Sequence, residues 1–172
     1  RQRQMCIRDR SKGVGTSLKH FAANNQETDR LRVSANISQR ALREIYFPAF
    51  EHIVKTAQPW TIMCSYNRIN GVHSAQNRWL LTDVLRDEWG YEGIVMSDWG
   101  ADHDRVASLN AGLNLEMPPS YTDDQIVYAA RDGRIQPEQL DRMAQGMVDL
   151  VNKTRAAMSV ENYRFDVDAH DE

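Results

Sequence analysis

The sequence predicts an α/β fold built on a parallel sheet, and three observations carry this prediction. Short apolar runs alternate with longer segments whose apolar residues recur at helical spacing, over most of the 172 residues. The run over residues 94–96 is apolar at consecutive positions, as in strands that are covered on both faces of a parallel sheet. Polar side chains follow three such runs, at Lys19-His20, Tyr66 and Asp98. About four strand–helix units are therefore expected, joined by right-handed crossovers.

The first unit is expected to begin with a strand over residues 16–21, followed by a polar loop over residues 22–36. Ser38 is a favourable helix N-cap, and apolar residues then recur from Leu42 to Val54 with the i, i+3, i+4, i+7 pattern of one buried face. Pro48 lies within this helix, so the helix should kink or lose a backbone hydrogen bond there.

The second unit begins with a predicted strand over residues 60–66, where β-forming residues are frequent. Asn70-Gly71 predicts a turn in the loop over residues 67–77. Asn77 is expected to cap the next helix, which should end before Gly90. The residues expected on its buried face are Leu81, Val84, Leu85 and Trp89.

The remaining units follow the predicted strand over residues 94–96. A short helix over residues 104–111 should stop at Gly112, and a fourth strand is expected over residues 113–117. Asp123 or Asp124 should cap the next helix, and Pro137 suits the first turn of the last one. The inward positions of that last helix are predicted to be Leu140, Met143, Ala144, Met147 and Val151.

Composition excludes several classes of function. A net charge of −3 offers no basic surface for nucleic acid, and no apolar run is long enough to cross a membrane. Cys6 and Cys64 do not form a disulfide framework, and the five histidines lack metal-ligand spacing. Neither a metal nor another cofactor is therefore expected, and the oligomeric state stays open.

Asp98 is the most informative single residue, because it stands where a buried strand ends. In strand–helix barrels the chemistry gathers at the carboxyl ends of the strands. A buried charge is costly unless something uses it. The alternative interpretation is an aspartate that caps the following helix from a loop.

Three segments carry a family resemblance: residues 19–27 (KHFAANNQE), 63–67 (MCSYN) and 97–99 (SDW). In order and spacing they resemble the barrel domain of glycoside hydrolase family 3, and most closely its bacterial β-glucosidases. The strand–helix pattern alone also allows an open doubly wound sheet, although that fold usually carries a glycine-rich phosphate turn that is missing here. The resemblance implies instead a (β/α)8 barrel of the TIM type.

A whole barrel takes about 250 residues. The resemblance therefore implies that residues 13–158 form only the C-terminal half of such a barrel, and that residues 159–172 are a linker towards a missing second domain. Residues 1–12 are rich in Arg and Gln. They do not resemble the family and are interpreted as a non-native extension.

The resemblance also implies site roles. Asp98 would be the nucleophile that forms a covalent glycosyl-enzyme intermediate, and the residues that bind the sugar would be Lys19, His20, Arg30, Met63, Tyr66 and Trp99. From the residues alone, Lys19 could extend along the surface, His20 and Met63 could belong to the core, Arg30 could be a solvated loop charge and Trp99 could pack under the barrel mouth.

The activity that the resemblance implies is that of a retaining exo-β-glycosidase acting on terminal β-D-glucosyl residues, so the expected partner is a β-glucoside or an oligosaccharide. A β-xylosidase, or another exo-glycosidase of the family, would use the same residues. A non-catalytic carbohydrate-binding fragment is the alternative from another class.

A retaining glycosidase needs a second carboxyl group as acid/base. The nearby candidates are Glu27, Asp102, Asp104 and Glu116. The resemblance places this group in the second domain instead, so the isolated chain is expected to turn over little or no substrate.

Overall fold

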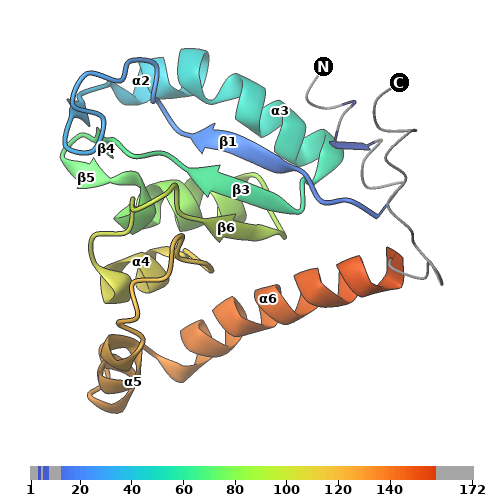
Figure 1. The fold of residues 1–172 in the computed structure, drawn as a ribbon. Helices are drawn as coiled ribbons and strands as arrows, with labels where there is room; N and C mark the ends of the chain where they lie inside the picture. The colour runs from blue at the N-terminus through green and yellow to red at the C-terminus, as the bar shows by residue number, and fades with distance from the viewer. Residues whose placement is uncertain (1–3, 5, 8–12, 158–172) are drawn as a thin grey trace, which may run out of the picture.

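The structure of the protein, a computed structural model, describes residues 4, 6–7 and 13–157. The linker predicted over residues 159–172, and most of the extension predicted over residues 1–12, lie outside the described residues. The main sheet has three parallel strands, β1 (Ser17–Phe21), β3 (Thr61–Cys64) and β6 (Ile94–Met96), side by side in that order (Figure 1). The three strands lie side by side in the order in which they occur in the sequence, as in the wall of a barrel. In a doubly wound sheet the order of the strands reverses near the middle of the sheet.

The register of the sheet explains how its faces differ. Leu18, Ile62 and Val95 lie side by side on the three strands and are all buried. Beyond Leu18 the register of β1 shifts by one residue, so that Lys19 and His20 together stand opposite one residue of β3. This is a β-bulge, a feature common next to active sites. In a regular strand the side chains of Lys19 and His20 would point to opposite faces of the sheet. The bulge interrupts this alternation.

The prediction of a fourth strand over residues 113–117 is wrong in its extent. A single parallel bridge joins Met96 to Leu115. The reason lies in Asn114, whose side-chain Oδ1 accepts the hydrogen bond of the Val95 amide at 2.9 Å. The side chain thus takes the place of a backbone carbonyl in the ladder. The segment still follows β6, because the Ser97 amide donates to the Leu115 carbonyl at 2.9 Å.

The first helical segment divides into α2 (Gln39–Ala41), a π-helical turn η1 (Leu42–Tyr46) and α3 (Pro48–Ala57). The predicted cap is confirmed, since Ser38 Oγ accepts a hydrogen bond from the Ala41 amide at 3.2 Å. The predicted break is confirmed as well. The Phe47 amide donates a hydrogen bond to the Leu42 carbonyl at 2.8 Å. The helix α3 then begins at Pro48, where the missing N–H breaks no hydrogen bond because amides in a first turn have no partner within the helix.

The next helix, η3 (Trp79–Glu88), follows a short 3₁₀ turn, η2 (Ser74–Gln76), and is wound as a π-helix. Asn77 caps it as predicted, because its Oδ1 accepts from the Leu80 amide at 3.1 Å. Gly90 ends it with a φ of +71°, a left-handed conformation that suits glycine. The predicted inward residues Leu81, Val84, Leu85 and Trp89 are all buried.

Three helices follow β6: α4 (Arg105–Ala111), α5 (Asp124–Arg131) and α6 (Pro137–Ala157). Asp104 caps α4 through its Oδ1 and the Ala107 amide at 2.9 Å. For α5 the predicted N-cap position is confirmed at Asp123, but its side chain makes no cap hydrogen bond. On α6 only Met143 of the predicted inward residues is buried, while Ala144 and Val151 are exposed, because α6 meets few neighbouring elements along its length (Figure 1).

Two apolar clusters hold these elements together. The larger one lies between the main sheet and the helices α3 and η3, where Phe47 packs against Phe21 and Trp89 with ring centroids 5.9 and 5.5 Å apart. The smaller one joins the last three helices through Leu109, Ile126, Ala129, Ile135 and Met143. Among the described helices, none is both long and apolar enough to cross a membrane.

The loops predicted over residues 22–36 and 67–77 contain a second, small sheet that the sequence did not indicate. It consists of β2 (Ser34–Ala35), β4 (Arg68–Ile69) and β5 (Val72–His73). The predicted turn is confirmed: Asn70 and Gly71 have φ values of +50° and +90°, as a two-residue hairpin of type I′ requires. This sheet connects the loop after β1 to the loop after β3.

Candidate active site

Asp98 lies two residues beyond the end of β6 and is 8% exposed. Its Oδ1 accepts a hydrogen bond from the Trp99 amide at 2.7 Å. Its Oδ2 lies 3.3 Å from Nε2 of His20, which comes from the bulge of β1. The carboxyl ends of the first and third main strands therefore meet at this carboxylate, and one of its oxygens is held by the backbone.

The loop that carries Asp98 is fastened to the segment after Leu115. The Met117 amide donates to Ser97 Oγ at 2.8 Å, and the Ser97 hydroxyl donates to the Met117 carbonyl at 3.1 Å. The Gly100 amide donates to the same carbonyl at 2.8 Å. These bonds on both sides of Asp98 fix the direction of its side chain without using its own oxygens.

Tyr66 and Arg30 form the next layer of the site. Burial raises the pKa of the Tyr66 hydroxyl, and the charge of Asp98 and a hydrogen bond with it raise this pKa further. The Arg30 guanidinium lies 5.2 Å from the centre of the Tyr66 ring, and its Nη1 contacts Glu27 Oε2 at 2.7 Å. Tyr66 thus keeps its proton at neutral pH and can donate it in a hydrogen bond to Asp98.

A buried polar network under Tyr66 was missed by the sequence-based prediction. Ser65 Oγ donates to the Ala22 carbonyl at 2.9 Å and lies 2.8 Å from Ser74 Oγ, which in turn donates to the Asn67 carbonyl at 2.9 Å. The network links the loops after β1 and β3 next to Tyr66 in the sequence. Ser65 and Asn67 flank Tyr66 in the MCSYN segment, so that motif contained the signal.

The side chains of three further predicted residues form no hydrogen bond with Asp98. These residues are Lys19, Met63 and Trp99. Lys19 is exposed within the bulge of β1. Met63 is half-buried on β3 and in register with Met96. Trp99 is 64% exposed, although its backbone holds Asp98. The structure thus joins His20 and Tyr66 to Asp98 through side chains and joins Arg30 to Tyr66, while the other three predicted residues lie beside that group.

Each of the four carboxylates considered as an acid already has a partner. Glu27 pairs with Arg30, and Asp104 caps α4. Asp102 and Glu116 lie on either side of Arg105, at 3.5 and 3.4 Å. Burial raises the pKa of the Asp102 carboxyl. Each of the four carboxylates is thus engaged in an ion pair or a helix cap with a neighbouring residue.

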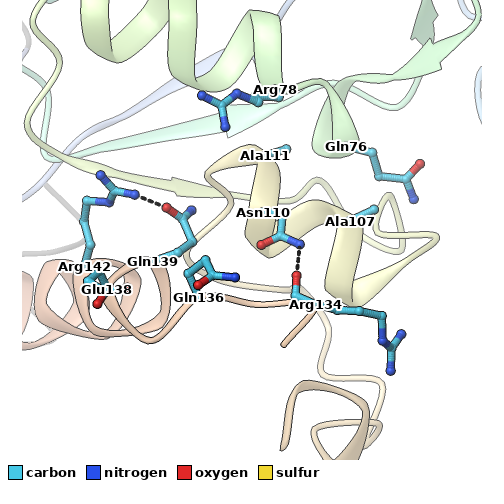
Figure 2. A pocket seen from close by; sticks show the side chains of 10 residues that line it. All are labelled: Gln76, Arg78, Ala107, Asn110, Ala111, Arg134, Gln136, Glu138, Gln139 and Arg142. Carbon is cyan, nitrogen blue, oxygen red and sulfur yellow. Dashed lines mark hydrogen bonds between the residues drawn. The ribbon is translucent and has the colours of Figure 1, made fainter. Parts of the chain in front are cut away.

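The cavities on the described surface include one distant from Asp98 and one near it. One of about 380 Å³ lies between η3, α4 and the start of α6 and is lined by amides and arginines, among them Asn110, Gln139 and Arg142 (Figure 2). None of its lining residues belongs to the site around Asp98. The other, of about 540 Å³, lies beside Arg30. Within residues 13–157 and the three described residues before them, no group of three or more His, Cys, Asp or Glu side chains is arranged to hold a metal ion.

The chain matches known proteins along most of its length. Residues 3–150 match the sequence model of the glycosyl hydrolase family 3 N terminal domain. The chain is 91% identical over 162 residues to an exo-α-(1→6)-L-arabinopyranosidase of Bifidobacterium breve, and 48% identical over 162 residues to the thermostable β-glucosidase B of Acetivibrio thermocellus. These alignments cover 94% and 93% of the chain but 21% of each relative, so the chain spans about a fifth of their length.

Solved structures agree with this. A family 3 β-glucosidase of Bifidobacterium adolescentis is 96% identical, with a TM-score of 0.90 over 94% of this chain and 24% of that one. The β-glucosidase 3B of Thermotoga neapolitana, in complex with glycerol, is 39% identical, with a TM-score of 0.89 over 98% of this chain and 25% of that one. Its sequence and its parallel strand order therefore place this chain in glycosyl hydrolase family 3, within the N-terminal barrel domain of that family.

Proposed function

We propose that this chain supplies the nucleophile and part of the sugar-binding site of a retaining exo-glycosidase, with Asp98 as the nucleophile. The observation that supports this most strongly is the position of the Asp98 carboxylate, which is nearly buried and oriented by the Trp99 amide and by His20. A carboxylate that only binds sugar hydroxyls can accept their hydrogen bonds from several directions and does not require this fixed orientation. A nucleophile does need a fixed orientation, because its attack on the anomeric carbon depends on the direction of approach.

The neighbours of Asp98 suit the steps of such a reaction. In the first step an oxygen of Asp98 attacks the anomeric carbon and the aglycone leaves, and in the second step water releases the sugar with net retention. Tyr66 can donate a hydrogen bond to Asp98 and so keep the carboxylate in place when no sugar is bound. Lys19, His20 and Arg30 offer charged or polar donors, which form strong hydrogen bonds with hydroxyl groups.

The acid/base is proposed to come from outside this chain. Glu27, Asp102, Asp104 and Glu116 are each engaged in local ion pairs or a helix cap. The curated relatives are also much longer than the chain, which spans 21% of them. The 172-residue chain alone should therefore hydrolyse glycosides poorly, since general acid catalysis contributes about 10²–10⁴-fold.

The terminal sugar is proposed to be a β-D-glucosyl residue, and a pentopyranosyl residue is the second candidate. The observation that favours the second is the 91% identity to an exo-α-(1→6)-L-arabinopyranosidase. Both kinds of glycoside carry the aglycone equatorially on a pyranose ring, so one carboxylate below the ring can attack either. A β-xyloside shares this geometry.

Azide rescue of a nucleophile variant tests this proposal. In the complete enzyme that carries this chain, Asp98→Ala should lower kcat on a 4-nitrophenyl glycoside by about 10⁴-fold or more. Added azide should restore turnover and yield a glycosyl azide of inverted anomeric configuration, because the small anion occupies the space of the lost carboxylate. Wild-type activity in Asp98→Ala, or rescue without inversion, would contradict the assignment.

A further inference from the structure

The cavity between η3, α4 and the start of α6 has a polar lining that the site around Asp98 does not use (Figure 2). Its volume of about 380 Å³ falls in the range of small-molecule sites, about 300–1,000 Å³. Its charged lining residues are the arginines Arg78, Arg134 and Arg142 and a single acid, Glu138, and most of the others are side-chain amides. The lining therefore carries more positive than negative charge.

Two of these arginines lack a close acidic partner. Arg142 of α6 has no carboxylate within ion-pair distance among the described residues, and its Nη2 donates to the neutral Oε1 of Gln139. Arg78, just before η3, has its Nε 3.6 Å from Asp83 Oδ1, which is longer than a hydrogen bond. Only Arg134 is closely paired, with its Nη2 2.9 Å from Asp132 Oδ2. Arg78 and Arg142 are therefore free to bind an anion.

A further guanidinium adds to the positive charge near Arg142. Arg86 of η3 donates to the Gly93 carbonyl at 3.0 Å and to Asn114 Oδ1 at 2.9 Å, and within the described part of the chain it forms no ion pair. Burial lowers the pKa of Arg86, and the charge of Arg142 also lowers it. The two like charges thus repel each other, and an anion beside Arg142 would reduce that repulsion.

The amides of the cavity supply acceptors next to these donors. Asn110 Nδ2 donates to the Arg134 carbonyl at 2.9 Å, and Gln136 Nε2 donates to the Gly133 carbonyl at 3.2 Å (Figure 2). Each side chain thus uses its NH₂ group on the backbone, and its oxygen meets no donor from the described residues. An amide oxygen accepts hydrogen bonds from hydroxyl groups. A ligand that carries both an anionic group and hydroxyl groups therefore matches the lining.

We propose that this cavity binds a phosphate monoester of a sugar, with Arg142 and Arg78 holding the phosphate. The planar guanidinium forms paired, charge-assisted hydrogen bonds with phosphate oxygens. The side-chain oxygens of Asn110 and Gln136 accept from the sugar hydroxyls, and so can the carboxylate of Glu138. A free phosphate ion would leave these acceptors unused. The site is separate from Asp98 and does not depend on the role of that residue.

Calorimetric titration of the complete enzyme with glucose 6-phosphate tests this. The titration is done with saturating 1-deoxynojirimycin, so that the probe is kept from the site around Asp98. Arg142→Gln should weaken the binding about tenfold or more, the value of one charge-assisted contact. Arg142→Lys keeps the charge without the planar fork and should recover part of that loss. Arg155→Gln, which removes an exposed arginine from the same helix, is the matched control and should bind as the wild type does.

Competition identifies the group that is recognised. Inorganic phosphate should displace glucose 6-phosphate with a lower affinity than the probe itself, and glucose should not displace it. Absence of binding to the wild-type enzyme, or equal affinity in Arg142→Gln and the wild type, would overturn the proposal. Displacement by glucose as readily as by inorganic phosphate would also overturn it, because the cavity would then recognise the sugar and not the phosphate.

Discussion

The helix-covered face of the main sheet and the rim of loops at its carboxyl end are built from different interactions. The covered face is apolar, with Leu18, Ile62 and Val95 in register and buried against the helices. The rim is held by hydrogen bonds and ion pairs, such as those of Ser97 with Met117 and of Arg105 with Asp102. Apolar burial thus holds the strands in place, while the direction of Asp98 depends on polar contacts.

Breaking the rim at Arg105 should have the largest effect on stability. Its guanidinium lies between Asp102, Glu116 and Asp123, at 3.5, 3.4 and 3.8 Å. Arg105→Met would leave the nearly inaccessible Asp102 carboxylate without its cation, which costs about 3–5 kcal/mol. Denaturant unfolding measures this cost.

The double variant Arg105→Met with Asp102→Asn removes both charges and should recover part of that loss. A double variant no more stable than Arg105→Met alone would show that the rim is held by packing and not by this ion cluster.

Breaking the covered face should cost somewhat less. Ile62→Ala removes a fully buried side chain from the centre of the sheet and should lower the free energy of unfolding by about 2–5 kcal/mol. Met63→Ala is the matched control on the next position of β3, where the side chain is half-buried on the other face. It should cost about 1 kcal/mol. Equal losses in the two variants would contradict the division between the faces.

The pH dependence of stability should carry the smallest effect. Burial, and then the neighbouring His103, lower the pKa of His73 below its ordinary 6.5. The unfolded chain therefore binds this proton more readily than the folded one, so stability is complete above pH 6.5 and falls as the pH drops from there towards the folded pKa.

The melting temperature of His73→Gln should accordingly change less than that of the wild type between about pH 7.5 and about pH 5. If the melting temperatures of the two proteins changed equally with pH over this range, His73 would not contribute to the pH dependence of stability.

Much of the covered face could be predicted from the sequence, because apolar spacing and caps are local signals. Ser38 and Asn77 cap their helices as expected, and Pro48 breaks its helix. The fourth strand was overpredicted, because the run over residues 113–117 gives no sign that the Asn114 side chain replaces a backbone group in the ladder.

The rim was harder to predict, because its contacts join residues far apart in the sequence. The motifs pointed to Asp98, His20 and Tyr66, and the structure brings them together. The bulge at Lys19-His20 and the small sheet joining the loops have no local signature. The same holds for the contact of His73 with His103, whose partners lie thirty residues apart.

The most direct test of the account is to trap the intermediate on Asp98. The complete enzyme is incubated with a 2-deoxy-2-fluoro-β-D-glucosyl donor that carries a good leaving group, then digested, and its peptides are analysed by mass spectrometry. We expect one fluoroglycosyl group, attached to Asp98 in the peptide that contains Ser97-Asp98-Trp99. An adduct on a different carboxylate, or a folded and active enzyme that turns over the donor without forming an adduct, would contradict it.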